Sequence, residues 1–172
     1  MEQNLIDLIQ RYLAVTSVAA SAVRGSPTGT AKAAQQYLAT LDLSRFGTSD
    51  PEGFQSALDL TTEELAGELP SHSWGVARKL LNIFLHNAFY NYYLRSEFQL
   101  GFAEELFEVP VDSAVAKGLR QRVGKGTLPT WMGVSALTPE KSGRYQEAAT
   151  TVATSRGCAR VHLDALLWVE NR

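Results

Sequence analysis

The sequence has little of what a disulfide framework, a cysteine-ligated metal site or a membrane span requires. Its single cysteine, Cys158, excludes an internal disulfide and any four-cysteine cluster, and is typical of a reducing compartment. No apolar run approaches the roughly 18 residues of a membrane helix. The acidic N-terminus lacks the basic region of a secretory signal. We therefore expect a cytoplasmic protein with no membrane segment.

Histidine is also scarce, and its three occurrences have no metal-ligand spacing. His72, His86 and His162 stand far apart, and the one cysteine adds no partner. The sequence also lacks GxxxxGK[ST] and a GxGxxG that follows a strand, which are the motifs of phosphate and dinucleotide binding. We expect no metal and no cofactor.

Strand-like alternation is absent over any useful length, and helical periodicity replaces it. The chain has 172 residues, of which 45% are hydrophobic and 20% charged, as in an ordinary globular protein. We predict a single compact all-α domain over residues 1–172. Its helices are expected at residues 3–22, 31–41, 51–59, 62–69, 77–95, 113–123, 139–155 and 159–170.

Helix-terminal signals support several of these limits. Asp50 before Pro51 is a typical N-cap followed by proline at the first helical position. Thr61 with Glu64 has the spacing of a capping box, which predicts a new helix at 62. Gly157 is a typical residue after a helix end.

Charge is distributed unevenly along the chain. The net formal charge is −2, but residues 1–70 hold four Lys/Arg and nine Asp/Glu, whereas residues 71–172 hold twelve and nine. Residues 113–126 hold four basic side chains and no acidic one, so this stretch is locally basic; the four are Lys117, Arg120, Arg122 and Lys125. Such a patch either binds a polyanion or is an ordinary solvated helix face, and charge alone leaves both open.

Residues 62–95 form a predicted helix, a tight glycine-containing turn and a long apolar helix. The long helix is expected to begin near Ala77, so Arg78 and Lys79 fall in its first turn, where acids are normally preferred. The basic pair is explained if the turn and the helix N-terminus face a phosphate. A plain helical hairpin with a solvated basic pair is the alternative.

Three segments together resemble the helix-hairpin-helix DNA glycosylases. GVARKLLNIFL at 75–85 resembles the hairpin and the lysine-bearing helix of that family. VPVDSAVAKGLRQRVG at 109–124 resembles its later segment, in which a VPVD precedes a helix that ends in basic residues. GCARVHLDALLWV at 157–169 resembles the closing helix of the archaeal 8-oxoguanine glycosylases.

This resemblance implies a site and a reaction. Lys79 is expected to attack the sugar and form a Schiff base, with Arg78 lowering its pKa, and Asp112 to stabilise positive charge on the sugar. Asp112 also suits a plain N-cap role. The expected contacts to the DNA backbone are Ser73, Gly75, Val76, Ala77 and Arg78. The expected base pocket holds Trp131, His162 and Trp168.

The sequence thus predicts an enzyme that excises a damaged base from duplex DNA, 8-oxoguanine first, with an associated lyase step. Such an enzyme is expected in the cytoplasm of a prokaryotic-like cell, associated with the nucleoid. The main alternative is a non-catalytic helix-hairpin-helix module that binds DNA or a protein, which Ala77 and the acidic net charge favour. A structural protein with a coincidental match is the third possibility. Oligomeric state stays open.

Overall fold

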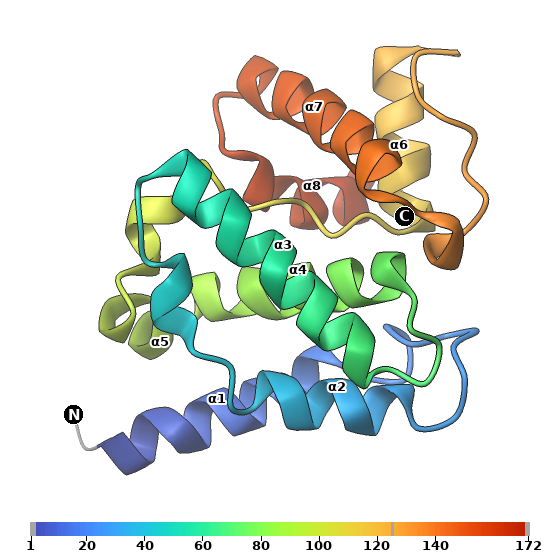
Figure 1. Cartoon of the computed structure of the whole chain (residues 1–172). Coiled ribbons are helices and arrows are strands. Elements are labelled where there is room, and N and C mark those ends of the chain that lie inside the picture. The colour runs from blue at the N-terminus through green and yellow to red at the C-terminus, as the bar shows by residue number, and fades with distance from the viewer. Residues whose placement is uncertain (1–2, 125, 171–172) are drawn as a thin grey trace.

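The computed structural model describes residues 3–124 and 126–170, and this part of the chain consists of helices and their connections (Figure 1). The all-α prediction is confirmed. The α-helices are α1 (Gln3–Ser17), α2 (Thr30–Leu38), α3 (Pro51–Glu68), α4 (Trp74–Tyr90), α5 (Tyr92–Glu97), α6 (Ser113–Val123), α7 (Pro139–Ser155) and α8 (Leu163–Glu170). Short 3-10 helices are η1 (Leu43–Phe46), η2 (Leu100–Ala103), η3 (Val134–Ala136) and η4 (Arg160–His162).

Helix α3 corrects the prediction of two short helices at 51–59 and 62–69. Asp50 caps its start as expected, accepting hydrogen bonds from the backbone N–H groups of Glu52 and Gly53. Thr61 caps nothing, because it lies buried inside the continuous helix, and Thr62 donates to the carbonyl of Leu58 at 2.7 Å. Residues 54–66 contain no glycine or proline, so the buried face continues through the expected break at 60–61.

Helix α4 begins three residues earlier than expected and ends five residues earlier. Ser73 is its N-cap and accepts a hydrogen bond from the N–H of Val76. Asn91 ends the helix and caps the next one by accepting from the N–H groups of Tyr93 and Leu94. Two other predicted helices also differ, since α1 stops at Ser17 instead of residue 22 and the last segment begins with η4.

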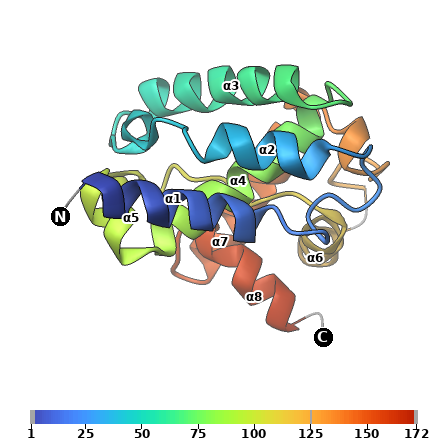
Figure 2. The ribbon, with the colours of Figure 1, turned by 90° about the horizontal axis from the view of Figure 1, so that it is seen from below.

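Two hydrophobic cores lie on either side of α4. The larger core joins α1, α2, α3, α4 and α5, and the smaller one joins α6, α7 and α8. Figures 1 and 2 show the first group at one end of the molecule and the second group at the other, with α4 running between them. Helix α4 contacts α1, α2, α3, α5, α7 and η3. The buried apolar side chains of α4 belong to the larger core, and Trp74 at its start packs against the smaller one, so this helix joins the two parts of the chain.

The start of α4 is packed directly against η3. A Cβ placed on Gly75 would lie 2.1 Å from the carbonyl oxygen of Val134 and 2.8 Å from the Cβ of Leu137. Glycine is required here by this close approach of two backbone segments. The contact joins the first turn of α4 to the segment that leads into α7. In the described part of the chain, no helix combines the length and apolar character needed to cross a bilayer.

Gly75→Ala tests this contact. The added methyl group must displace backbone, so we expect a loss of about 1–3 kcal/mol in the free energy of unfolding. Gly67 lies in α3 with open space around its Cβ position, so Gly67→Ala should stabilise the protein by up to about 1 kcal/mol through helix propensity. Chemical denaturation of both variants gives the comparison. Equal stability of the two variants would contradict the packing described here.

Candidate active site

Lys79 and Asp112 line one polar cavity of about 350 Å³. They are 33 residues apart in sequence and come from α4 and from the residue before α6. The remaining lining residues are Ser21, Arg24, Ser113, Trp131, Gly133 and Val134. The cavity therefore combines the loop after α1, the start of α6 and the loop before η3.

Local hydrogen bonds hold both side chains in place. The Lys79 Nζ donates to the carbonyl of Ala22 at 2.7 Å, which joins α4 to the loop after α1. The Asp112 Oδ1 accepts from the N–H groups of Ala114 and Val115 at 2.8 and 2.9 Å, so Asp112 is the N-cap of α6. The capping geometry leaves the carboxylate at the cavity, and the structural and the chemical role of this residue are compatible.

Burial sets the charge state of the lysine. Removal of the ammonium group from water lowers the pKa of Lys79, and the negative charges of Asp112 and Asp164 oppose this effect. The effect of burial is the larger one. A lysine with a lowered pKa holds a greater fraction of the neutral, nucleophilic amine at a given pH.

Asp164 is the residue of this site that the sequence reasoning missed. Burial raises the pKa of its carboxyl group, and the negative charge of Asp112 raises it further. The positive charges of His86 and Lys79 act in the opposite direction. The four side chains thus form one electrostatic cluster, of which Lys79 and Asp112 line the cavity. Of the two added groups only His86 had a signal in the sequence, because it follows Lys79 by seven residues on the same face of a helix, whereas Asp164 had none.

Residues 106–112, the linker that leads to α6 and carries Asp112, are held by hydrogen bonds from side chains of later segments. Arg160 donates to the carbonyls of Leu106 and Phe107 at 2.8 and 2.9 Å. Gln146 of α7 accepts from the N–H of Val109 and donates to its carbonyl, at 3.1 and 2.8 Å. Each of these bonds fixes backbone within six residues of Asp112. The carboxylate therefore stands on a rigid segment.

Arg78 has an environment quite different from that of Lys79, and the expectation that it contacts DNA is wrong. Its side chain is 4% exposed and donates through Nε and Nη2 to Glu108 at 2.8 and 2.9 Å. Its Nη1 donates to Asp59 and Thr62 at 2.8 and 2.9 Å. Asn82, one turn further along α4, also donates to Glu108. The guanidinium is therefore already paired with carboxylates inside the protein.

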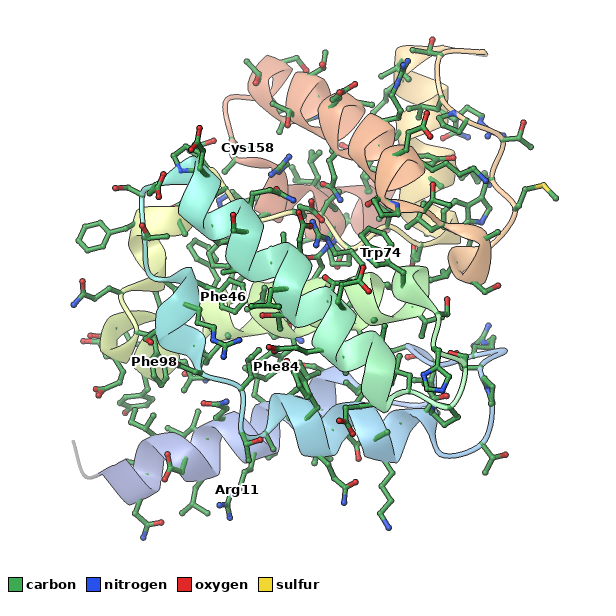
Figure 3. The ribbon with its side chains drawn as sticks, viewed as in Figure 1. Arg11, Phe46, Trp74, Phe84, Phe98 and Cys158 are labelled. Atoms are coloured by element: carbon green, nitrogen blue, oxygen red, sulfur yellow. The ribbon has the colours of Figure 1, made fainter. Side chains whose placement is uncertain are left out.

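Trp74 completes the surroundings of Arg78. The guanidinium carbon lies 5.3 Å from the centre of the indole, and Figure 3 shows Trp74 in the region where α3, α4 and α7 meet. Both residues line a separate cavity of about 540 Å³ that does not include Lys79. Arg78 is also not among the charges that shift the pKa of Lys79, so the expected assistance from Arg78 is replaced by burial.

The other predicted backbone contacts are corrected in the same way. Gly75, Val76 and Ala77 are buried in the first turn of α4, where they pack against the protein itself. They belong to a helix and not to an exposed hairpin turn, because the helix begins at Trp74. Ser73 is partly exposed, but its hydroxyl is used as the N-cap.

Of the three residues predicted for a base pocket, Trp131 lines the Lys79 cavity and His162 does not. Trp131 packs edge-on against Tyr145, with ring centres 5.8 Å apart. The Nδ1 of His162 pairs with the hydroxyl of Tyr90 at 2.5 Å and its Nε2 with Glu104 at 2.9 Å. The side chain of Trp168 lies outside the described part of the structure.

The basic helix α6 uses two of its arginines within the fold. Arg120 donates to the carbonyl of Pro129 at 3.0 Å, and Arg122 pairs with Glu170 and with the carbonyl of Gly118. Lys117 is exposed. Lys125 lies outside the described residues. The helix therefore offers less free positive charge than its sequence indicated.

No group of three His, Cys, Asp or Glu side chains is arranged to hold a metal ion within residues 3–124 and 126–170. Comparison of the chain with family models, with curated proteins and with solved structures finds no match. The resemblance to the glycosylases therefore stays a prediction, and function has to be argued from the site itself.

The Arg78–Glu108 pair provides a test of how α4 and the linker are joined. Arg78→Met leaves the buried carboxylate of Glu108 without its ion-pair partner and should cost about 3–5 kcal/mol of folding free energy, whereas Glu108→Gln should cost less because Asp59 still pairs with the arginine. Arg45–Glu64 is a matched control, since its side chains are 39% and 38% exposed. Arg45→Met should cost at most about 1 kcal/mol. Urea denaturation measures all three, and similar losses in the two pairs would contradict this assignment.

Proposed function

We propose that this protein is a DNA N-glycosylase with an associated lyase activity that acts through Lys79. We place this activity in the cytoplasm, on duplex DNA. One observation carries the proposal: a lysine with a lowered pKa and a carboxylate line the same cavity. This pair has the two groups that such a reaction needs, a nucleophile and a negative charge to stabilise an oxocarbenium-like transition state.

The proposed reaction begins with neutral Lys79. Its amine attacks C1′ of the damaged nucleotide while the N-glycosidic bond breaks, and the departing base takes the bonding electrons and a proton. Asp112 stabilises the positive charge that develops on the sugar. Opening of the sugar ring gives a Schiff base between Nζ and C1′. Loss of a proton from C2′ then expels the 3′ phosphate, and water releases the enzyme.

The other residues of the cavity suit an extruded nucleotide. Arg24 provides positive charge beside the cavity, and Trp131 provides an aromatic face for a base removed from the stack. We choose 8-oxoguanine as the preferred damaged base because residues 157–169 resemble the closing helix of the archaeal 8-oxoguanine glycosylases. Base identity is therefore the first substrate variable to test.

A second candidate is the non-catalytic module that binds DNA or a protein. The acidic net charge of −2 favours it. The burial of Gly75, Val76, Ala77 and Arg78 speaks against a hairpin grip on the DNA backbone, which needs those positions exposed, and so favours a protein as the partner of such a module. The two candidates make different demands on Lys79. Catalysis requires its amine, whereas a binding module does not.

Borohydride trapping distinguishes them. A labelled duplex with one 8-oxoguanine, or with one abasic site, is incubated with the protein and borohydride, and covalent complexes are counted on a denaturing gel. We expect a trapped band that Lys79→Gln abolishes. Lys32→Gln, an exposed lysine on α2, is the matched control and should leave the band unchanged.

Absence of a band with both duplexes would remove the lyase assignment. If the wild-type protein then still shifts duplex DNA in a native gel, the non-catalytic module is the better description. If it neither traps nor shifts DNA, the glycosylase and the DNA-binding module both fail, and of the second candidate only a protein-binding module is left.

The pH dependence of strand cleavage at an abasic site tests the electrostatic cluster. The reaction needs neutral Lys79, so its rate should rise with pH through the pKa of that lysine. The negative charge of Asp164 raises the pKa of Lys79, so Asp164→Asn should lower that pKa further and move the rising limb to lower pH. An unchanged profile, or a shift to higher pH, would contradict the cluster.

A further inference from the structure

Helix α1 carries apolar side chains on two opposite faces. Ile6 and Ala14 on its inner face are buried, and Gln10 between them donates to the carbonyls of Leu38 and Leu41. The outer face carries four large apolar residues that are 45–69% exposed: Leu5, Leu8, Tyr12 and Val15. We call these four residues the α1 stripe.

The α1 stripe has the geometry of a helix-pairing seam. Its members are separated by three, four and three residues, which is the a and d spacing of a coiled coil. On a helical wheel they cluster about half a turn away from the buried residues. A single exposed leucine needs no explanation, but a continuous row along one helix marks an interaction surface.

We propose that the α1 stripe pairs with the α1 stripe of a second copy of this chain, in an antiparallel arrangement about a twofold axis. The 3-4-3 spacing reads the same in both directions. An antiparallel copy therefore places Leu8 opposite Tyr12 of the partner and Leu5 opposite Val15, and the twofold axis repeats both contacts. The surface is self-complementary without any further segment.

The edges of the stripe fit the same arrangement. Asp7 and Arg11 lie along one edge, and the twofold axis places Arg11 of each copy about 3 Å, measured along the helix, from the level of Asp7 of the partner. The resulting group of two acids and two bases is neutral. The other edge holds Ile9 and Thr16, which bring no charge to the seam. Charges of a single sign along these edges would oppose pairing of two copies, and neither sign is in excess here.

The stripe is accessible in the folded monomer. Helix α1 contacts α2, α4 and α5 on its inner side and flanks, and Figures 1 and 2 show it at the outer edge of the molecule. Figure 3 shows Arg11 pointing away from the body of the protein. A partner can therefore dock without any rearrangement of the core. The limited length of the seam predicts a reversible dimer and not a permanent one.

Sedimentation velocity over a concentration series tests the dimer. The wild-type chain should pass from monomer to dimer with rising concentration, and Leu8→Glu/Tyr12→Glu should remain monomeric. Both side chains are exposed, so the variant should keep its thermal transition. Phe102→Glu, which changes an apolar residue exposed to a similar extent outside α1, is the control and should dimerise as the wild type does.

Cysteine cross-linking tests the direction and register. In a Cys158→Ser background, Leu8→Cys and Tyr12→Cys are introduced into two separate chains, one of which carries a tag so that a gel distinguishes the mixed dimer from the two homodimers. A disulfide between chains should form in high yield only when the two variants are mixed, because residue 8 faces residue 12 of the partner. Strong cross-linking of either variant alone would indicate a parallel pair and overturn the proposed arrangement.

Two further results would overturn the proposal. A wild-type chain that stays monomeric at every concentration has no self-pairing surface, and a dimer that persists in Leu8→Glu/Tyr12→Glu uses another surface. A monomer that co-sediments with phosphatidylglycerol vesicles through the same four residues would assign the stripe to a membrane surface instead. None of these results depends on whether Lys79 is catalytic.

Discussion

The buried ion pair between Arg78 and Glu108 is the interaction on which the arrangement of this protein depends. It joins the central helix to the extended linker, and Asp59 and Asn82 share in the same network. A charge taken out of water is costly unless it is paired and hydrogen-bonded, so the two elements have one acceptable relative position. That position brings Lys79, which follows Arg78, and Asp112, which lies four residues after Glu108, to the same cavity.

The adjacent residues Arg78 and Lys79 on α4 consequently have different roles. Successive residues of a helix point about 100° apart, so Arg78 turns toward α3 and the linker while Lys79 turns toward the loop after α1. The arginine remains charged because it is compensated by carboxylates. The lysine is less well compensated, and burial shifts it toward the neutral form. The same helix turn therefore supplies a rigid support and a candidate nucleophile.

The sequence alone predicted the helical class and several helix limits, since these depend on local patterns. Asp112 was identified both as an N-cap and as a candidate site residue, and the structure places it beside Lys79. Arg78 was misread because its partners lie 19 and 30 residues away, beyond any local signal. Asp164 was missed for a similar reason, because only tertiary packing brings α8 to α4 and α6.

The two hydrogen bonds from Gln146 to Val109 have a consequence for sequence variation. One side-chain amide occupies both polar groups of a peptide segment, as a neighbouring strand would in a sheet. Within the described chain this segment has no strand beside it, so a hydrophobic residue of similar size at 146 would leave a buried donor and acceptor unpaired. Among homologous sequences, position 146 should therefore vary far less than the surrounding residues of α7, and should change together with the conformation of the linker.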